Sequence, residues 1–128
     1  MPEVCRIWLQ PITTNAGAVD YIVDEGVSGI WTYRKWNSGI AECWGIGTVS
    51  VTCTNEKGVY YSDPKSIALP SNLFNGDSAA SATLADPFCW VTNVVASTSA
   101  VSFRVIRGES YSNTFSPRVS LFVKGKWK

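Results

Sequence analysis

Hydrophobic residues in this chain occur in short runs rich in Val, Ile, Thr, Tyr, Phe and Trp, which are separated by clusters of Gly, Asn, Asp, Ser and Pro. The spacing of three to four residues that marks an amphipathic helix is nearly absent. This combination is typical of an all-β domain built from antiparallel strands. We predict strands at residues 4–10, 20–23, 30–36, 40–45, 48–55, 59–69, 88–95, 101–107 and 118–127.

Turn residues support these divisions. Residues 55–58 (NEKG) suit a tight turn in which Gly58 supplies a positive φ angle. The dipeptides Asp63-Pro64 and Leu69-Pro70 mark bends or edge positions, where proline removes no needed ladder hydrogen bond. We predict that the small and polar residues 71–84 form a loop, with a short helical turn as the lesser alternative.

No internal repeat, low-complexity tract or linker divides the chain. Its length of 128 residues suffices for one hydrophobic core. We therefore predict that residues 1–128 form a single antiparallel β-sandwich domain. Residues 1–20 are either an N-terminal strand of this domain or a connector.

The segment 31–44, WTYRKWNSGIAECW, is predicted to be a β-hairpin. Asn37-Ser38-Gly39 suits a three-residue loop, in which a type I turn is followed by Gly39 in the left-handed region. That loop places Trp36 opposite Ile40. It then pairs Lys35 with Ala41, Arg34 with Glu42, Tyr33 with Cys43, and Thr32 with Trp44.

Because side chains alternate along a strand, one face carries Ile30, Thr32, Arg34, Trp36, Ile40, Glu42 and Trp44. The other face carries Trp31, Tyr33, Lys35, Ala41 and Cys43.

Both faces of this hairpin therefore carry aromatic rings. A strand pair with one face in water alternates apolar and polar side chains, so here a further layer must cover the second face. We predict that a neighbouring subunit covers it, with an Arg34–Glu42 ion pair held between Trp36 and Trp44 as the oligomer interface. The alternative is that Trp36 or Trp44 packs under the loop at 71–84.

Charge and hydropathy exclude two classes of partner. Eleven Lys and Arg nearly balance ten Asp and Glu, so no strong field steers the chain toward nucleic acid or an anionic membrane. No apolar run approaches the roughly 20 residues of a membrane span. The first residues lack the features of a signal peptide. We expect a soluble protein without an export signal, a nucleic-acid partner or membrane insertion.

The four cysteines, Cys5, Cys43, Cys53 and Cys89, form no C-x-x-C pair, and the chain contains no histidine. We therefore expect no metal and no cofactor. Each cysteine lies within an apolar run and no secretory signal precedes them, so buried free thiols are favoured over two disulfides.

The lack of histidine also removes the Ser-His-Asp and Cys-His arrangements. Glu42 beside Cys43 is better explained as a strand residue paired with Arg34 than as a catalytic acid, because no second carboxylate or base has a reason to lie near it. We predict that the protein is not an enzyme, and a carboxylate-based glycan-degrading activity is the remote alternative.

The stretch 20–45, DYIVDEGVSGIWTYRKWNSGIAECWG, resembles a pattern in C-terminal domains of bacteriophage and prophage tail or minor structural proteins of Gram-positive hosts. The similarity continues through residues 59–62 (VYYS) and the closing strand 119–128. It implies a virion component near a fibre tip or baseplate, synthesised in the bacterial cytoplasm. It also implies a homotrimer, other virion proteins as partners and recognition of host cell-wall polysaccharide.

The order of the later strands is similar to the small trimeric sandwich of the H-type lectins. The polar segment 108–114, GESYSNT, has the composition of surfaces that stack on sugars and bond their hydroxyls. We predict Glu109, Tyr111 and Asn113 as glycan-binding residues, unless the segment is an ordinary hairpin connection. A stand-alone lectin-like module is thus the alternative function. The tail KGKWK is predicted to be a solvated strand end anchored by Trp127.

Overall fold

The computed structural model describes residues 19–76, 78–109 and 111–128, with the backbone alone at 111 and 112. All regular elements among these residues are β-strands, and every strand pair is antiparallel. The predicted all-β antiparallel class is confirmed. Within this part of the chain, no helix could cross a membrane. The predicted strand at 4–10 and Cys5 lie outside the described residues.

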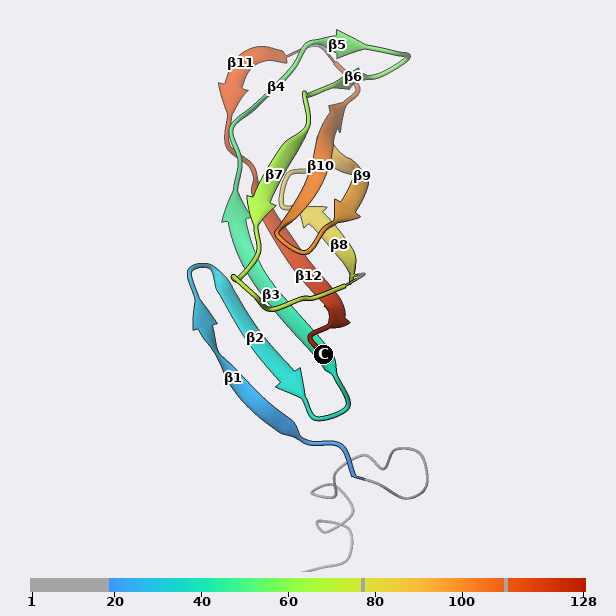
Figure 1. Ribbon diagram of the computed structural model, residues 1–128. Coiled ribbons are helices and arrows are strands. Elements are labelled where there is room, and N and C mark those ends of the chain that lie inside the picture. The colour runs from blue at the N-terminus through green and yellow to red at the C-terminus, as the bar shows by residue number, and fades with distance from the viewer. Residues whose placement is uncertain (1–18, 77, 110) are drawn as a thin grey trace, which may run out of the picture.

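The first sheet has five strands in the order β1-β2-β3-β12-β8. They are β1 (Ile22–Ser28), β2 (Trp31–Trp36), β3 (Ile40–Thr48), β12 (Arg118–Lys126) and β8 (Ser78–Leu84). The strands β1, β2 and β3 are consecutive in sequence and form an up-and-down meander, whereas β12 and β8 join from the second half of the chain. Figure 1 shows this sheet as a long layer, with β1 at its free edge.

The second sheet is centred on β10 (Ala100–Arg107), which pairs with β9 on one side and with β6 and β7 on the other. Its other members are β5 (Asn55–Glu56), β6 (Tyr60–Tyr61), β7 (Lys65–Ala68) and β9 (Cys89–Ala96). A separate ribbon of β4 (Val51–Cys53) and β11 (Tyr111–Phe115) lies at the end of the molecule where β5 and β6 also lie (Figure 1).

The two sheets pack face to face over one hydrophobic core. Alternate residues of β10 and β12 point into it and are almost fully buried: Val101, Phe103, Val105, Val119, Leu121 and Val123. Ala41 and Cys43 of β3 lie in the same cluster. Burying a side chain of this size contributes about 1.5–3 kcal/mol, so this alternation stabilises the β-sandwich.

The predicted hairpin is confirmed in register and in turn. Arg34 pairs with Glu42 and Thr32 with Trp44, and the Gly39 N–H donates to the Trp36 carbonyl at 3.0 Å. Gly39 has a φ of +99°, which a residue without Cβ adopts at little cost.

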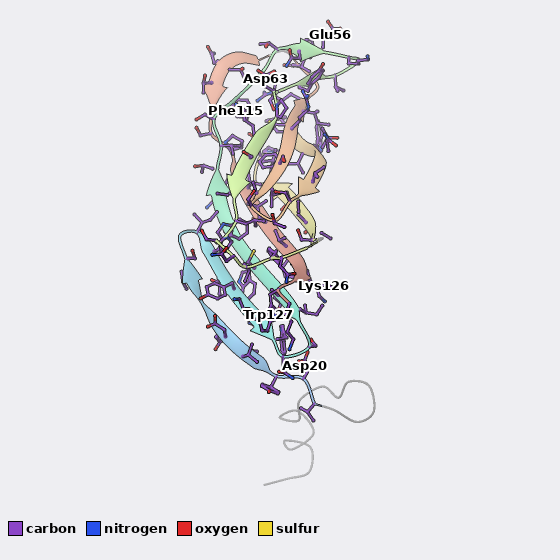
Figure 2. All side chains as sticks on the ribbon, viewed as in Figure 1. Asp20, Glu56, Asp63, Phe115, Lys126 and Trp127 are labelled. Carbon is purple, nitrogen blue, oxygen red and sulfur yellow. The ribbon has the colours of Figure 1, made fainter. Side chains whose placement is uncertain are left out.

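The C-terminal end closes over this turn, as Figure 2 shows for Trp127. The Trp127 backbone N–H donates to the Gly39 carbonyl at 2.9 Å, and its indole N–H donates to the Trp36 carbonyl at 2.8 Å. The prediction that Trp127 anchors the basic tail is confirmed.

The prediction of a loop at residues 71–84 is wrong in its second half. Residues 78–84 form β8, an edge strand paired with β12 from Ser78↔Gly125 to Leu84↔Val119. Its inward positions are Ala80, Ala82 and Leu84, and its outward positions are Ala79, Ser81 and Thr83. Small residues of low β-propensity hide this alternation, and pairing with β12 overrides the propensity.

Residues 108–114 are likewise not a simple loop, because residues 111–115 form β11 against β4. The predicted strand 59–69 is interrupted at 62–64, next to the Asp63-Pro64 bend. The predicted strand 48–55 is divided, because Thr48 ends β3, residues 51–53 form β4 and Asn55 begins β5. Gly58 has the expected positive φ of +80°. Cys43, Cys53 and Cys89 are buried free thiols, as predicted.

Candidate functional site

The side of the first sheet that faces away from the core, called here the outer face, carries a row of side chains that crosses all five strands. Cross-strand pairing aligns Val27, Thr32, Trp44, Phe122 and Ser81 in this row. Val27 is 75% exposed and Phe122 42% exposed, and Ile46 beside them on β3 is 58% exposed. Large apolar side chains thus meet solvent both at the edge of the sheet and on its central strands, where a monomer ordinarily places polar ones.

A second row runs beside the first and alternates in charge. It consists of Glu25, Arg34, Glu42 and Lys124, paired strand to strand. Arg34 Nη1 lies 3.9 Å from Glu42 Oε1, and 40% of the Arg34 side chain is exposed. At that exposure the pair is worth about 0.5 kcal/mol, so it orders the face more than it stabilises the fold.

The four predicted interface residues meet on this face. The Arg34 guanidinium lies 4.8 Å from the centre of the Trp44 ring, and the Trp36 indole N–H donates to Glu42 Oε1 at 3.4 Å. The predicted ion pair between two tryptophans is therefore present, and both rings remain partly exposed. Their role as an oligomer interface stays a prediction.

The alternative cover for these tryptophans is wrong. Leu73 and Phe74, from the loop that follows β7, are buried in the core on the inner side of the sheet. That loop borders Tyr33 and Lys35, which point to the opposite side from Trp36 and Trp44. The remainder of the segment is β8, which extends the same sheet and cannot cover it.

Asp20 ties the start of β1 to the turn between β2 and β3. Its carboxylate accepts the Ser38 N–H at 2.9 Å and the Ser38 hydroxyl at 2.7 Å, and it also accepts the Tyr21 N–H. The hydrogen bond from the Ser38 hydroxyl is the main cause that lowers the pKa of Asp20. Asp20 lies at the foot of the β1–β2–β3 meander in Figure 2. The contact fixes β1 at the edge of the outer face.

A cleft of about 360 Å³ lies where the chain enters β9 and leaves β10. Its lining consists of Pro87, Phe88, Trp90, Arg107, Gly108 and Glu109. Phe88 is 67% exposed and Trp90 is 55% exposed, so two aromatic rings face solvent at one concave place. The Phe88 N–H donates to Asp86 Oδ1 at 2.8 Å, which fixes the bend that turns Phe88 outward.

Arg107 is held in a set position at this cleft. Its Nη1 donates to Cys89 Sγ at 3.7 Å, and its guanidinium lies 5.2 Å from the centre of the Phe115 ring. Burial is the main cause that raises the pKa of the Cys89 thiol, so the sulfur stays protonated and neutral near pH 7. The arginine thus remains the charged partner of this contact.

The structure separates the predicted glycan-binding residues. Glu109 lines the cleft, whereas Asn113 is exposed on β11 and does not line it. The structure describes only the backbone of Tyr111. Sequence reasoning missed Phe88 and Trp90, although a signal existed: alternation around Cys89 turns Trp90 out of the core.

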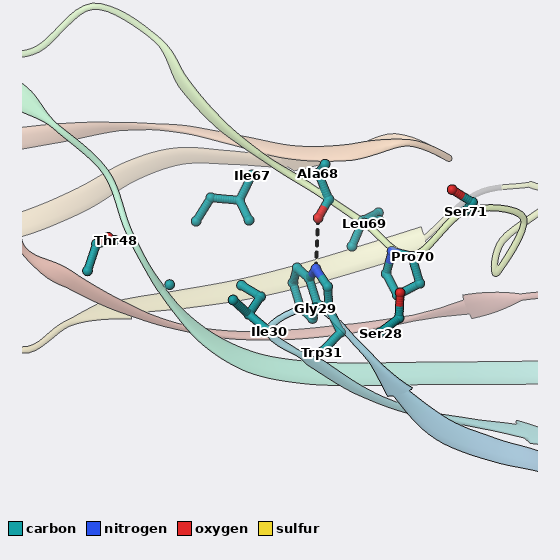
Figure 3. Close-up of a pocket in the computed structure, with 11 residues that line it drawn as sticks. Ser28, Gly29, Ile30, Trp31, Thr48, Ile67, Ala68, Leu69, Pro70 and Ser71 are labelled. Atoms are coloured by element: carbon teal, nitrogen blue, oxygen red, sulfur yellow. Dashed lines mark hydrogen bonds between the residues drawn. The ribbon is translucent and has the colours of Figure 1, made fainter.

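Another cavity, of about 470 Å³, lies between the β1–β2 turn and β7 (Figure 3). No charged side chain lines it. The Trp31 indole N–H already donates to the Ala68 carbonyl at 2.7 Å, and Trp31 is 3% exposed. The polar side chains in its lining are the hydroxyls of Ser28, Thr48 and Ser71, so the cavity lacks a charged group to orient a ligand.

The described residues contain no group of three or more His, Cys, Asp or Glu side chains placed to hold a metal ion.

Comparison with known proteins gives one structural similarity. No protein-family model matches the chain. No curated protein matches it either. Among solved structures, an N-truncated R1-type pyocin tail fibre is similar over 98% of this chain and 96% of that chain, at 13% identity and a TM-score of 0.48. A TM-score below 0.5 is too low to establish a common fold or function.

Proposed function

We propose that this chain is a non-enzymatic structural domain of a phage tail or tail-like appendage of a Gram-positive host. It associates as a homotrimer through the outer face of its first sheet, and it contributes to recognition of host cell-surface glycans. The outer face is the observation that carries the proposal. The appendage assignment is supported by the resemblance of residues 20–45 to tail structural proteins.

Self-association is supported by the chemistry of the outer face. Trp44 and Phe122 are direct cross-strand neighbours, with Ile46 and Val27 close by, and contiguous apolar surface of this kind marks interaction sites. The adjacent row alternates between carboxylate and cation. In a threefold ring the two different ends of this row meet, so the Lys124 end of one copy would lie beside the Glu25 end of the next with unlike charges opposed, which favours a second copy over an unrelated partner.

The first prediction is therefore oligomerisation of the wild-type protein. Sedimentation equilibrium and light scattering at micromolar concentration should give three times the chain mass of 14.0 kDa. Phe122→Lys and Ile46→Lys each place a charge inside the apolar contact, and each should shift the protein toward monomer. Both side chains are already exposed in the single chain, so the fold should persist by circular dichroism.

Val95→Lys is the matched control. Val95 is 55% exposed on β9 of the second sheet, so the same charge is introduced at similar exposure away from the outer face. It should leave the mass unchanged. A monomeric wild-type protein, or equal effects of Val95→Lys and Phe122→Lys, would contradict association through the outer face.

A lectin-like carbohydrate-binding module is the second candidate function. The cleft at Phe88 and Trp90 favours it, because exposed aromatic rings beside charged hydrogen-bonding groups are a common form of small-ligand site. A monomeric protein that binds sugar would support this candidate alone. A trimer in which binding persists after dissociation by Phe122→Lys would support both functions on separate surfaces.

A further inference from the structure

We infer that the cleft formed by Phe88, Trp90, Arg107 and Glu109 binds an uncharged pyranose ring of a polysaccharide. This inference rests on the glycan-recognition part of the proposed function and is independent of trimer formation. It differs from the sequence-based prediction, since only Glu109 of the three predicted residues belongs to the site.

The two aromatic rings specify the shape of the ligand. A pyranose presents an apolar C–H face on one side and hydroxyl groups around its rim, so it gains by covering an exposed ring while its hydroxyls stay wet. Trp90 is 55% exposed and Phe88 67% exposed, although both are of the residue types that gain most from burial. The volume of about 360 Å³ is near the lower end for small-molecule sites, which suits one or two sugar rings.

The polar groups specify the charge of the ligand. Arg107 provides guanidinium donors whose position is fixed by Cys89 and Phe115, and Glu109 provides an exposed carboxylate acceptor. Donors and acceptors at one rim suit the hydroxyl groups of a sugar, each of which both donates and accepts. The two charged residues that line the cleft have opposite signs, and the nearby Asp86 carboxylate is engaged by the Phe88 N–H, so neither an acidic nor a basic sugar gains a large net electrostatic advantage.

The main competing occupant of this region is a strand from another chain. β9, the strand beside the cleft, is poorly suited to pair with such a strand. β9 is an edge strand, but its pairing with β10 is irregular between Ser102 and Arg104. Asn93, opposite this irregularity, has a φ of +55°. Bulges of this kind twist an edge away from further pairing. Side-chain contacts at Trp90 are therefore favoured over strand addition.

The test uses methyl glycosides of glucose, galactose and N-acetylglucosamine, with glucuronic acid and glucosamine as charged counterparts. Titration of the full chain by ¹H–¹⁵N NMR follows the indole N–H of Trp90, assigned with the Trp90→Phe variant. At least one neutral glycoside should shift this signal. Trp90→Ala should weaken that binding by at least about tenfold, whereas Val95→Ala on the same strand should not change it.

The possible results test sugar binding at the cleft separately from trimer formation. If no neutral glycoside shifts the Trp90 signal, or if Trp90→Ala binds as tightly as wild type, the cleft is not the sugar site. Tighter binding of glucuronic acid than of all neutral glycosides would overturn the charge assignment. If Trp90→Ala is unfolded, the titrations of Phe88→Ala and of the wild-type protein decide whether the cleft is the sugar site. The mass of each sample is measured in parallel, so a trimeric wild-type protein that binds none of the neutral glycosides contradicts the cleft and leaves the proposed assembly standing.

Discussion

Cys43 and Trp44 are neighbours in β3 and meet opposite environments. The Cys43 thiol is fully buried in the core, whereas the Trp44 ring is partly exposed on the outer face against Arg34. Alternation along the strand produces this difference without any change in local composition. At the residue scale, the position of a residue along the strand therefore decides whether its side chain is buried in the core or exposed on the outer face.

Burial makes Cys43, Cys53 and Cys89 unreactive, which is a testable consequence. Burial raises the pKa of the Cys43 thiol from 9.0 to about 12, and it also raises the pKa of Cys53 and Cys89. In a Cys5→Ser background, an aromatic disulfide reagent at pH 8 should label none of the three thiols rapidly in native protein and all three in denaturant. Rapid labelling of two or three thiols in the native state would contradict the buried assignment.

The same shift predicts a loss of stability at alkaline pH. Because the pKa of Cys43 is higher in the folded than in the unfolded protein, the contribution of this thiol to the free energy of unfolding is complete below about pH 9. It then declines as pH rises from about 9 toward 12 while the unfolded thiol ionises. Urea unfolding of Cys43→Ala beside wild type isolates this part of the pH dependence.

At the element scale, one glycine decides how tightly the β1–β2 turn approaches β3. Gly45 pairs with Trp31, and a Cβ at this position would collide with the backbone carbonyl of Ile30. The colliding atom belongs to the backbone, so it cannot move aside as a flexible side chain would. The close approach of these strands therefore requires glycine here.

Gly45→Ala should lower the free energy of unfolding by about 1–3 kcal/mol, as overpacking does. Gly76→Ala is the matched control, because its Cβ would meet no atom within 4 Å, and it should stay within about 0.5 kcal/mol of wild type. Urea denaturation of both variants measures the difference. Equal stabilities would mean that the β1–β2 turn shifts to admit the methyl group.

At the scale of the whole molecule, the two proposed surfaces lie on opposite sides of the sandwich. The outer face belongs to the first sheet, and Trp90 points outward from the second sheet because its neighbour Cys89 is buried. Association through the first sheet thus leaves the cleft open in every copy. Three copies would present three clefts to one polysaccharide.

This arrangement predicts avidity. Phe122→Lys should leave the affinity for a methyl glycoside unchanged and should weaken binding to an immobilised polysaccharide of the same sugar by about 10² or more. Surface plasmon resonance with both ligands compares the two affinities, with Val95→Lys as the control. An equal loss for both ligands would indicate that the outer face itself contacts sugar.

The sequence by itself determined the all-β class and the register of the hairpin at 31–44. Both are local properties: alternation sets the class, and the turn at Asn37-Ser38-Gly39 sets which residues face each other. It also placed Arg34, Trp36, Glu42 and Trp44 on one side. It did not reveal β8, whose small residues form a strand only because β12, far along the chain, supplies hydrogen bonds.

Only the tertiary structure decided what covers each face and where the cleft lies. The cleft joins the start of β9 to the end of β10, and it depends on the pairing of Cys89 with Arg107. The outer face is assembled from strands drawn from both halves of the chain. Contacts between segments distant in sequence leave little trace in local patterns, because each segment satisfies its own alternation whichever strand becomes its neighbour.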